Sequence, residues 1–110
     1  MKENIVSDLL RGHTDTVVLS ILAKSDNYGY EIRKGIIEKA GGNFELKEAT
    51  LYSSYRRLEE SGFITSYWGD ETQGGRRRYY HITDTGQELL RQNKSDWRKT
   101  QQLLNDLLED

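Results

Sequence analysis

The chain has 110 residues, of which 35% are hydrophobic and 31% charged, so we expect one domain with a modest core. It contains no cysteine, which excludes disulfides and cysteine-ligated zinc. No segment approaches the roughly 20 apolar residues needed to cross a bilayer, so a soluble, cytoplasmic protein is expected. A net charge of -2 argues mildly against nucleic acid as a partner, so any such affinity must come from local basic clusters.

The first part of the chain is predicted to form two helices. Residues 5–24 carry apolar residues at helical spacing, with Gly12 as a weak point inside the pattern. The sequence SDN at 25–27 is rich in capping residues and predicts a second helix over 28–40. Two glycines, at 41–42, are expected to end it.

Three features around this second helix suggest contacts with nucleic acid or with the later hairpin. The free amides of its first turn could bind a backbone phosphate, with Tyr28 and Tyr30 beside them. Lys47 could reach another phosphate, although a lone lysine is more often a solvated charge. Residues 44–46 are expected to form a short third strand beside the hairpin.

Residues 49–62 are predicted to form a helix with two different faces. Leu51, Tyr55 and Leu58 recur at spacings of four and three, so their side chains form one buried stripe. Gly62 stands where a left-handed residue would close the helix. The opposite face carries small hydroxyls, a phenol and two guanidinium groups, which suit a DNA groove: Thr50, Tyr52, Ser53, Arg56 and Arg57.

Tyr52 and Arg56 are the strongest candidates for contacts with bases, with Thr50 and Ser53 in support. A bidentate contact from Arg56 to guanine would contribute ~1–3 kcal/mol of discrimination. Helical spacing does not separate base reading from phosphate binding, and Tyr52 could equally be a rim aromatic that covers the core. Both roles therefore stay open.

A basic hairpin is predicted after this helix. Alternating patterns at 64–68 and 76–82 indicate two strands, joined by the polar, glycine-rich tip GDETQGG at 69–75. Three arginines in a row are often only a solvated surface, but their place beside this tip and a basic helix favours DNA contact. We expect Arg76 and Arg77, with Gly75, to contact phosphates or the minor groove, and Arg78 to brace the sheet.

The order helix, strand, basic tip, strand is that of a winged helix-turn-helix, in which the helix reads the major groove and the wing touches the backbone. The expected fold class is therefore α+β and mostly helical, with residues 1–83 forming a DNA-binding unit. Signals for an enzyme are poor, because the chain lacks a phosphate-binding loop and a nucleophile elbow. His13 and His81 have no ligand-like spacing, so no metal site is expected.

A long helix is predicted to fill residues 84–110. Thr83 and Thr85 are both credible N-caps, and Thr85 with Glu88 has the spacing of a capping box. The chain offers little to cover this helix, so we expect it to pack against a second copy across a two-fold axis. Such a dimer would set two reading helices about 34 Å apart on a palindromic operator. The expected seam alternates spacings of three and four: Leu90, Asn93, Trp97, Thr100, Leu104 and Leu107.

Three segments resemble the signatures of PadR-type transcriptional regulators over nearly the whole chain: YGYEI, TLYSSYRRLEESGFI and GRRRYYHIT. The single helix after the wing resembles the short, second subfamily, and SYWGDETQGGRRRYY resembles its lactococcal multidrug-binding branch. The resemblance implies a homodimeric repressor, without a cofactor, that a planar aromatic compound or another signal releases from DNA.

In that branch a tryptophan at the place of Trp97 lines a cavity at the dimer centre, and the resemblance implies ligand contacts there. A tryptophan on a helix seam is more often plain core, so this role stays open. The implied ligand-binding residues are Val6, Leu10, Trp97 and Gln101.

The competing interpretation is a winged-helix protein-protein adaptor that does not bind DNA. Residues 84–110 hold six acidic and four basic side chains, which keeps this alternative open.

Overall fold

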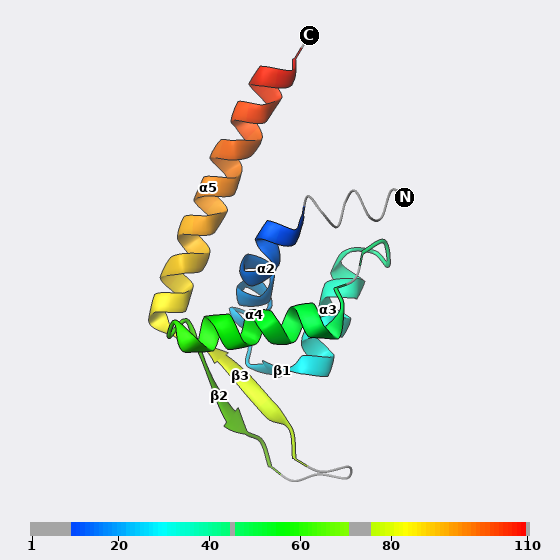
Figure 1. Ribbon diagram of the computed structural model, residues 1–110, viewed down its shortest axis with the longest axis vertical. Coiled ribbons are helices and arrows are strands. Elements are labelled where there is room, and N and C mark those ends of the chain that lie inside the picture. Colours follow the sequence, from blue (N-terminus) through cyan, green and yellow to red (C-terminus); the bar gives the residue numbers. More distant parts are fainter. Residues whose placement is uncertain (1–9, 45, 71–75, 110) are drawn as a thin grey trace.

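The computed structural model describes residues 10–44, 46–70 and 76–109, and only the backbone of Arg11. Helices α2, α3 and α4 form a small body with a three-stranded sheet, and α5 leaves this body as a long rod (Figure 1). The elements, in order, are the 3-10 turn η1 (Arg11–His13), α2 (Thr14–Leu22), β1 (Asn27–Tyr28), α3 (Gly29–Lys39), α4 (Glu48–Glu60), β2 (Ile64–Trp68), β3 (Arg78–Ile82) and α5 (Asp84–Leu108).

The helical pattern at the start of the chain is interrupted. Within the described part of the predicted helix 5–24, η1 precedes α2, and the break coincides with Gly12. The second predicted helix is found as α3, within a residue of its expected ends. None of the helices in the described ranges has both the length and the apolar character that a membrane crossing requires.

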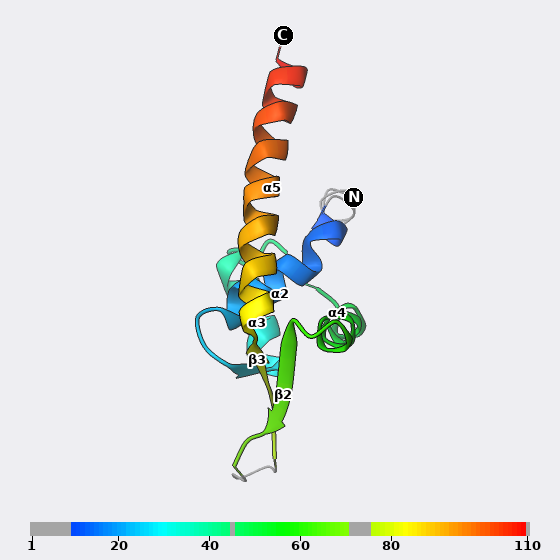
Figure 2. The ribbon, with the colours of Figure 1, turned by 90° about the vertical axis from the view of Figure 1, so that its left-hand side faces the viewer.

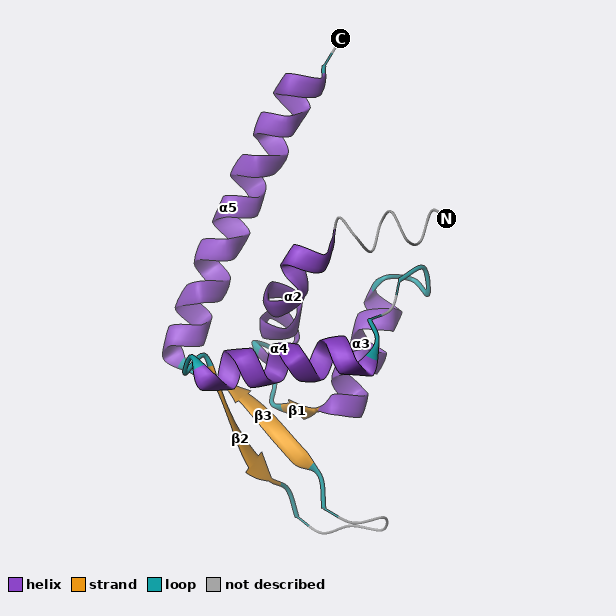
Figure 3. Cartoon of the chain, in the orientation of Figure 1, coloured by secondary structure: helices purple, strands orange, loops and turns teal. Residues whose placement is uncertain are grey.

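The sheet is antiparallel and has the order β1-β3-β2 (Figure 3). The two hairpin strands pair from Ile64↔Ile82 to Trp68↔Arg78. The first strand has its predicted bounds, but the second, predicted from residue 76, begins only at Arg78. The third strand was expected at 44–46, and this is wrong: Phe44 and Leu46 lie in no strand and pack into the core instead. The third strand is β1, whose two residues are too few to show an alternating pattern.

The core lies where α2, α3, α4 and the sheet meet. The predicted stripe of Leu51, Tyr55 and Leu58 is buried, and complete burial of such a side chain contributes about 1.5–3 kcal/mol. The other buried apolar residues are Val18, Leu19, Leu22, Ile32, Ile36, Leu46, Ile64, Tyr80, Ile82 and Leu90.

The turn between α4 and the wing depends on Gly62, as predicted. Its φ of 80° is left-handed, and its N–H donates to the Glu59 carbonyl over 3.1 Å. The next amide, of Phe63, donates to the Leu58 carbonyl over 2.9 Å. These two bonds close the helix in a Schellman motif and send the chain into β2.

Thr83, rather than Thr85, caps α5. The Thr83 hydroxyl accepts a hydrogen bond from the Gly86 amide over 3.1 Å, whereas the Thr85 hydroxyl donates to the Gly62 carbonyl. The predicted capping box of Thr85 and Glu88 is therefore wrong. The first turn of α5 also lies close to the turn before β2, because a Cβ added to Gly86 would lie 2.1 Å from the Phe63 carbonyl oxygen. Gly86 therefore permits a close contact that a larger residue would prevent.

Beyond its first turns α5 runs away from the body, on the side opposite the wing in both views (Figures 1 and 2). Gly86 and Leu90 are its buried residues among those described. Four leucines near its end, Leu103, Leu104, Leu107 and Leu108, are 44–76% exposed. The single chain therefore leaves much of this helix uncovered.

Candidate nucleic-acid interface

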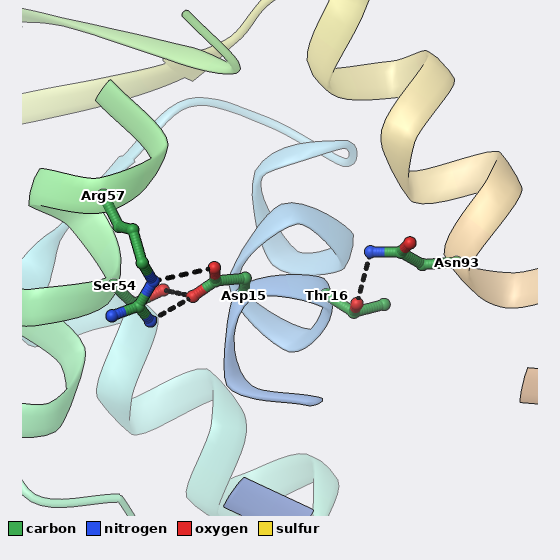
Figure 4. Close-up of polar contacts among 5 residues, drawn as sticks. All are labelled: Asp15, Thr16, Ser54, Arg57 and Asn93. Atoms are coloured by element: carbon green, nitrogen blue, oxygen red, sulfur yellow. Dashed lines mark hydrogen bonds and ion pairs between the residues drawn. The ribbon is translucent and has the colours of Figure 1, made fainter. Parts of the chain in front are cut away.

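Helix α4 is fixed on one flank by Asp15 of α2 (Figure 4). The Asp15 carboxylate accepts hydrogen bonds from Ser54 over 2.7 Å and from the Arg57 guanidinium over 2.6 and 3.0 Å. Partial burial raises the pKa of Asp15, but the hydrogen bonds from Arg57 and Ser54 outweigh burial and hold this pKa below its usual value. Arg57, expected on the open groove face, is thus turned sideways onto α2.

The other predicted groove residues are Tyr52, Ser53 and Arg56, away from Asp15, and Thr50, one turn before Ser54. Ser53 and Arg56 are exposed, Tyr52 is 54% exposed, and Thr50 is half-buried in the first turn. Arg56 makes no ion pair with any residue in the described ranges. Tyr52 also packs edge-on against Tyr55, with 5.7 Å between ring centroids. The ring thus covers part of the core and remains accessible, and a contact of Tyr52 with DNA stays a prediction.

The start of α3 lies beside this face. Tyr30, in the first turn of α3, is 70% exposed and lines a hollow of about 310 Å³ together with Tyr52 of α4. Lys47 is the exposed residue that precedes α4. The structure thus brings Tyr30 and Tyr52, which are far apart in the sequence, to one surface between the two helices.

Arg78 braces the wing, as expected from the alternation. Its Nη2 donates to Glu59 of α4 over 3.2 Å and to the Ser66 hydroxyl of β2 over 2.9 Å. Arg76 and Arg77 lie before β3, are exposed, and have no carboxylate partner among the described residues. Gly75, predicted to contact DNA with them, lies outside the described residues.

A polar junction at the base of the wing was missed by sequence reasoning. The Asp26 carboxylate accepts a hydrogen bond from the Tyr67 hydroxyl over 2.6 Å, and His81 Nδ1 lies 2.8 Å from it. The hydrogen bond from Tyr67 is the main cause that lowers the pKa of Asp26. His81, expected as a plain surface residue, thus ties β3 to the loop before β1. No local pattern could have linked residues that are 41 and 55 positions apart.

Among the implied ligand residues that the structure describes, Leu10 and Trp97 line different hollows. Leu10 lines a hollow of about 260 Å³ between α2 and α3, whereas Trp97 lines another of about 210 Å³ between α5 and the start of α2. Gln101 is exposed one turn beyond Trp97, and Val6 lies outside the described residues. Trp97 is 44% exposed and packs edge-on against His13, with 5.2 Å between ring centroids, so it is not plain core.

Several known proteins that this chain resembles are named as regulators of transcription. The model of the transcriptional regulator PadR-like family matches residues 18–92. A solved transcriptional regulator from Clostridium thermocellum is 44% identical with a TM-score of 0.86, over 94% of this chain and 97% of that one. An uncharacterised protein from Lysinibacillus sphaericus is 38% identical over 94% of each chain. The transcriptional regulator YqjI of Escherichia coli is 30% identical over 76% of this chain but only 38% of its own length.

The family match spans the sheet, α3, α4, the second half of α2 and the first part of α5, and the structural likeness extends over nearly the whole chain. The predicted fold class is confirmed, and the family consists of transcriptional regulators rather than enzymes. The finer assignment to the lactococcal branch stays a prediction. The chain belongs to the PadR-like family of transcriptional regulators.

Proposed function

We propose that this regulator binds double-stranded DNA in the cytoplasm as a homodimer and represses transcription. The proposal rests on the different surroundings of two sides of α4. One flank of the helix is fixed by Asp15, and the other presents Tyr52, Ser53 and Arg56 to solvent. A helix held on one side and open on the other can enter a major groove without rearranging.

The distribution of paired and unpaired arginines also supports DNA contact through α4 and the wing. Arg57 and Arg78 are bound to carboxylates inside the fold, so their charges are largely cancelled. Arg56, Arg76 and Arg77 have no such partner among the described residues, and they lie on the exposed face of α4 and at the wing. Uncancelled guanidinium groups can replace the counterions around phosphates, which makes binding favourable and dependent on salt.

We propose that residues 84–110 form the dimerisation helix and residues 1–83 the unit that binds DNA. Burial of a fully exposed leucine contributes about 1.5–3 kcal/mol, and the partly exposed leucines near the end of α5 would each gain a share of this against a second copy of the helix. A two-fold axis through this helix pair would place two copies of α4 about one DNA turn apart. The operator would then be a palindrome.

Release by a planar aromatic effector would require coupling between α5 and α4, and α2 offers a route. Adjacent residues of α2 contact both helices: Asp15 binds Arg57 of α4, while the Thr16 hydroxyl accepts a hydrogen bond from the Asn93 amide of α5 over 2.8 Å (Figure 4). A compound stacked against Trp97, with Val6, Leu10 and Gln101 around it across the dimer, would shift α5 and through α2 the reading helix. DNA and effector would then weaken each other by the same factor.

The test of DNA binding is an anisotropy titration of fluorescent duplexes from the region upstream of the chain's own gene and from a genomic pool, at several salt concentrations. Arg76→Ala/Arg77→Ala should weaken binding and reduce the salt slope by about 0.9 for each phosphate that the variant no longer neutralises. Arg98→Ala/Lys99→Ala removes the same charge from α5 and should leave the slope unchanged. Equal slopes for the wing variant and wild type would contradict the proposed role of the wing.

The alternative, a protein-protein adaptor without DNA binding, rests on the acidic balance of residues 84–110. An adaptor predicts that wild type retains no duplex from the genomic pool at any salt concentration. Retention that falls steeply with salt would exclude it as the main activity.

A further inference from the structure

Each of the three wing arginines lies over an aromatic ring, and the three rings come from three different strands. The guanidinium carbon of Arg76 is 5.3 Å from the ring centroid of Trp68 in β2. For Arg77 the partner is Tyr28 in β1 at 4.7 Å, and for Arg78 it is Tyr80 in β3 at 5.8 Å. All three distances are within the range of attraction between a cation and a ring face.

The arginines differ in what else they bind. Arg78 also contacts the carboxylate of Glu59, which neutralises it and makes it a brace within the fold. Arg76 and Arg77 contact rings but no carboxylate of the described residues. A ring restrains a guanidinium group without cancelling its charge and leaves its N–H edges open to a phosphate. A carboxylate would occupy those same edges.

The ring beneath Arg77 is itself anchored. Tyr28 is the residue that precedes α3, pairs with Tyr79 in the sheet, and packs against the Tyr79 ring with 5.4 Å between centroids. Tyr79 in turn stacks on Tyr67 at 5.7 Å, and the Tyr67 hydroxyl is bound to Asp26. Arg77 is thus attached, through rings, to the start of α3 as well as to the wing. Its guanidinium group has a fixed place relative to the helical body.

We infer that Tyr28 and Trp68 are positioning residues, which hold Arg77 and Arg76 with their charge uncancelled in the place where the wing meets the DNA backbone. The inference rests on the proposed DNA binding and adds a role, holding the arginines, that the predicted contacts do not include. Restraining the two long side chains before binding lowers the entropy lost when each contacts a phosphate. The rings act through the arginines and need not touch DNA.

The test is a double-mutant cycle on DNA affinity, measured by anisotropy with a duplex that wild type retains. Tyr28→Leu removes the ring face and should weaken binding about two- to fivefold. Tyr28→Phe retains the ring face and should bind within about twofold of wild type. In the Arg77→Ala background the effect of Tyr28→Leu should vanish, because no cation remains to be held. Thermal unfolding of each variant verifies that it is folded.

The salt slope separates positioning from direct contact. Tyr28→Leu should retain the wild-type slope, since the number of neutralised phosphates is unchanged, whereas Arg77→Ala should reduce it by about 0.9 for each of the two wings, or about 1.8 for the dimer. A loss of affinity that persists in the Arg77→Ala background, or full affinity of Tyr28→Leu, would overturn the inference while leaving DNA binding intact. Absence of salt-dependent binding by wild type would overturn the proposed function itself. The pair Trp68→Leu and Arg76→Ala provides an independent second cycle with the same expectations.

Discussion

The winged body (α2 to β3) and the outer half of α5 (residues 97–108) differ in how their side chains are bound. In the body, side chains from distant parts of the chain bind each other: Asp15 with Arg57, Glu59 with Arg78, and Asp26 with His81. The outer half of α5 has instead a local hydrogen bond, from Gln102 to Asp106 one turn away. The body thus holds ion pairs between distant segments, whereas the outer half of α5 exposes four leucines to solvent. This difference supports the proposal that the outer half of α5 packs against a second copy of the chain.

The largest effect is expected when the exposed leucines in the outer half of α5 are made polar. Leu104→Asp/Leu107→Asp should convert the dimer to a monomer, because two buried carboxylates would replace apolar contacts across the axis. DNA affinity should fall by more than about tenfold, since the two half-sites are no longer bound together. Light scattering coupled to size-exclusion chromatography measures the mass. Asn105→Asp adds a charge on the same turns and is the matched control; an unchanged mass for the leucine variant would refute dimerisation through this helix.

The junction between the two regions is the next place to test. Gly86→Ala should destabilise the fold by about 1–3 kcal/mol or more, because the added Cβ would meet the Phe63 carbonyl oxygen at 2.1 Å. Gly12→Ala is the control, since nothing lies within 4 Å of the Cβ it would add. Urea unfolding gives both values. Equal free energies of unfolding for the two variants would contradict this prediction, because they would show that the start of α5 can move to accommodate a side chain.

The smallest expected effect concerns the bond that fixes α4 within the body. Asp15→Asn should cost about 1 kcal/mol at neutral pH, because the Arg57 pair is half-exposed and screened while the Ser54 bond is more protected. The lowered pKa of Asp15 means that its contribution is complete above its unfolded pKa, near 4, and is lost as pH falls through the folded value. The stability difference between wild type and variant should therefore shrink below about pH 4. A difference that stays constant with pH would contradict the pairing.

Local features of the fold were predictable from the sequence because a helix or strand leaves its period in consecutive residues. The stripe of Leu51, Tyr55 and Leu58, the turn at Gly62 and the wing strands follow from such patterns. The wrong strand at 44–46 shows the limit, because a two-residue strand has no period and is defined by its partner.

The candidate site was predictable to a similar degree. The face of α4 and the wing arginines stand out by residue type, but the contacts that orient them do not. Asp15 and Arg57 are 42 positions apart, and the ring beneath Arg77 belongs to a residue expected only as a phosphate contact, Tyr28. The sequence left the cap of α5 open between Thr83 and Thr85 for a related reason, since Thr85 is bound instead to the distant Gly62 carbonyl.

The central claim is that two copies of α4 and two wings bind one DNA duplex across a two-fold axis. Hydroxyl-radical footprinting on a duplex retained from the genomic pool tests it most directly. We predict two protected patches related by a dyad, with centres about one helical turn, or roughly 10 base pairs, apart. The Leu104→Asp/Leu107→Asp variant should lose both patches together at concentrations where wild type protects them. A single unsplit patch, or equal protection by the monomeric variant, would contradict the account.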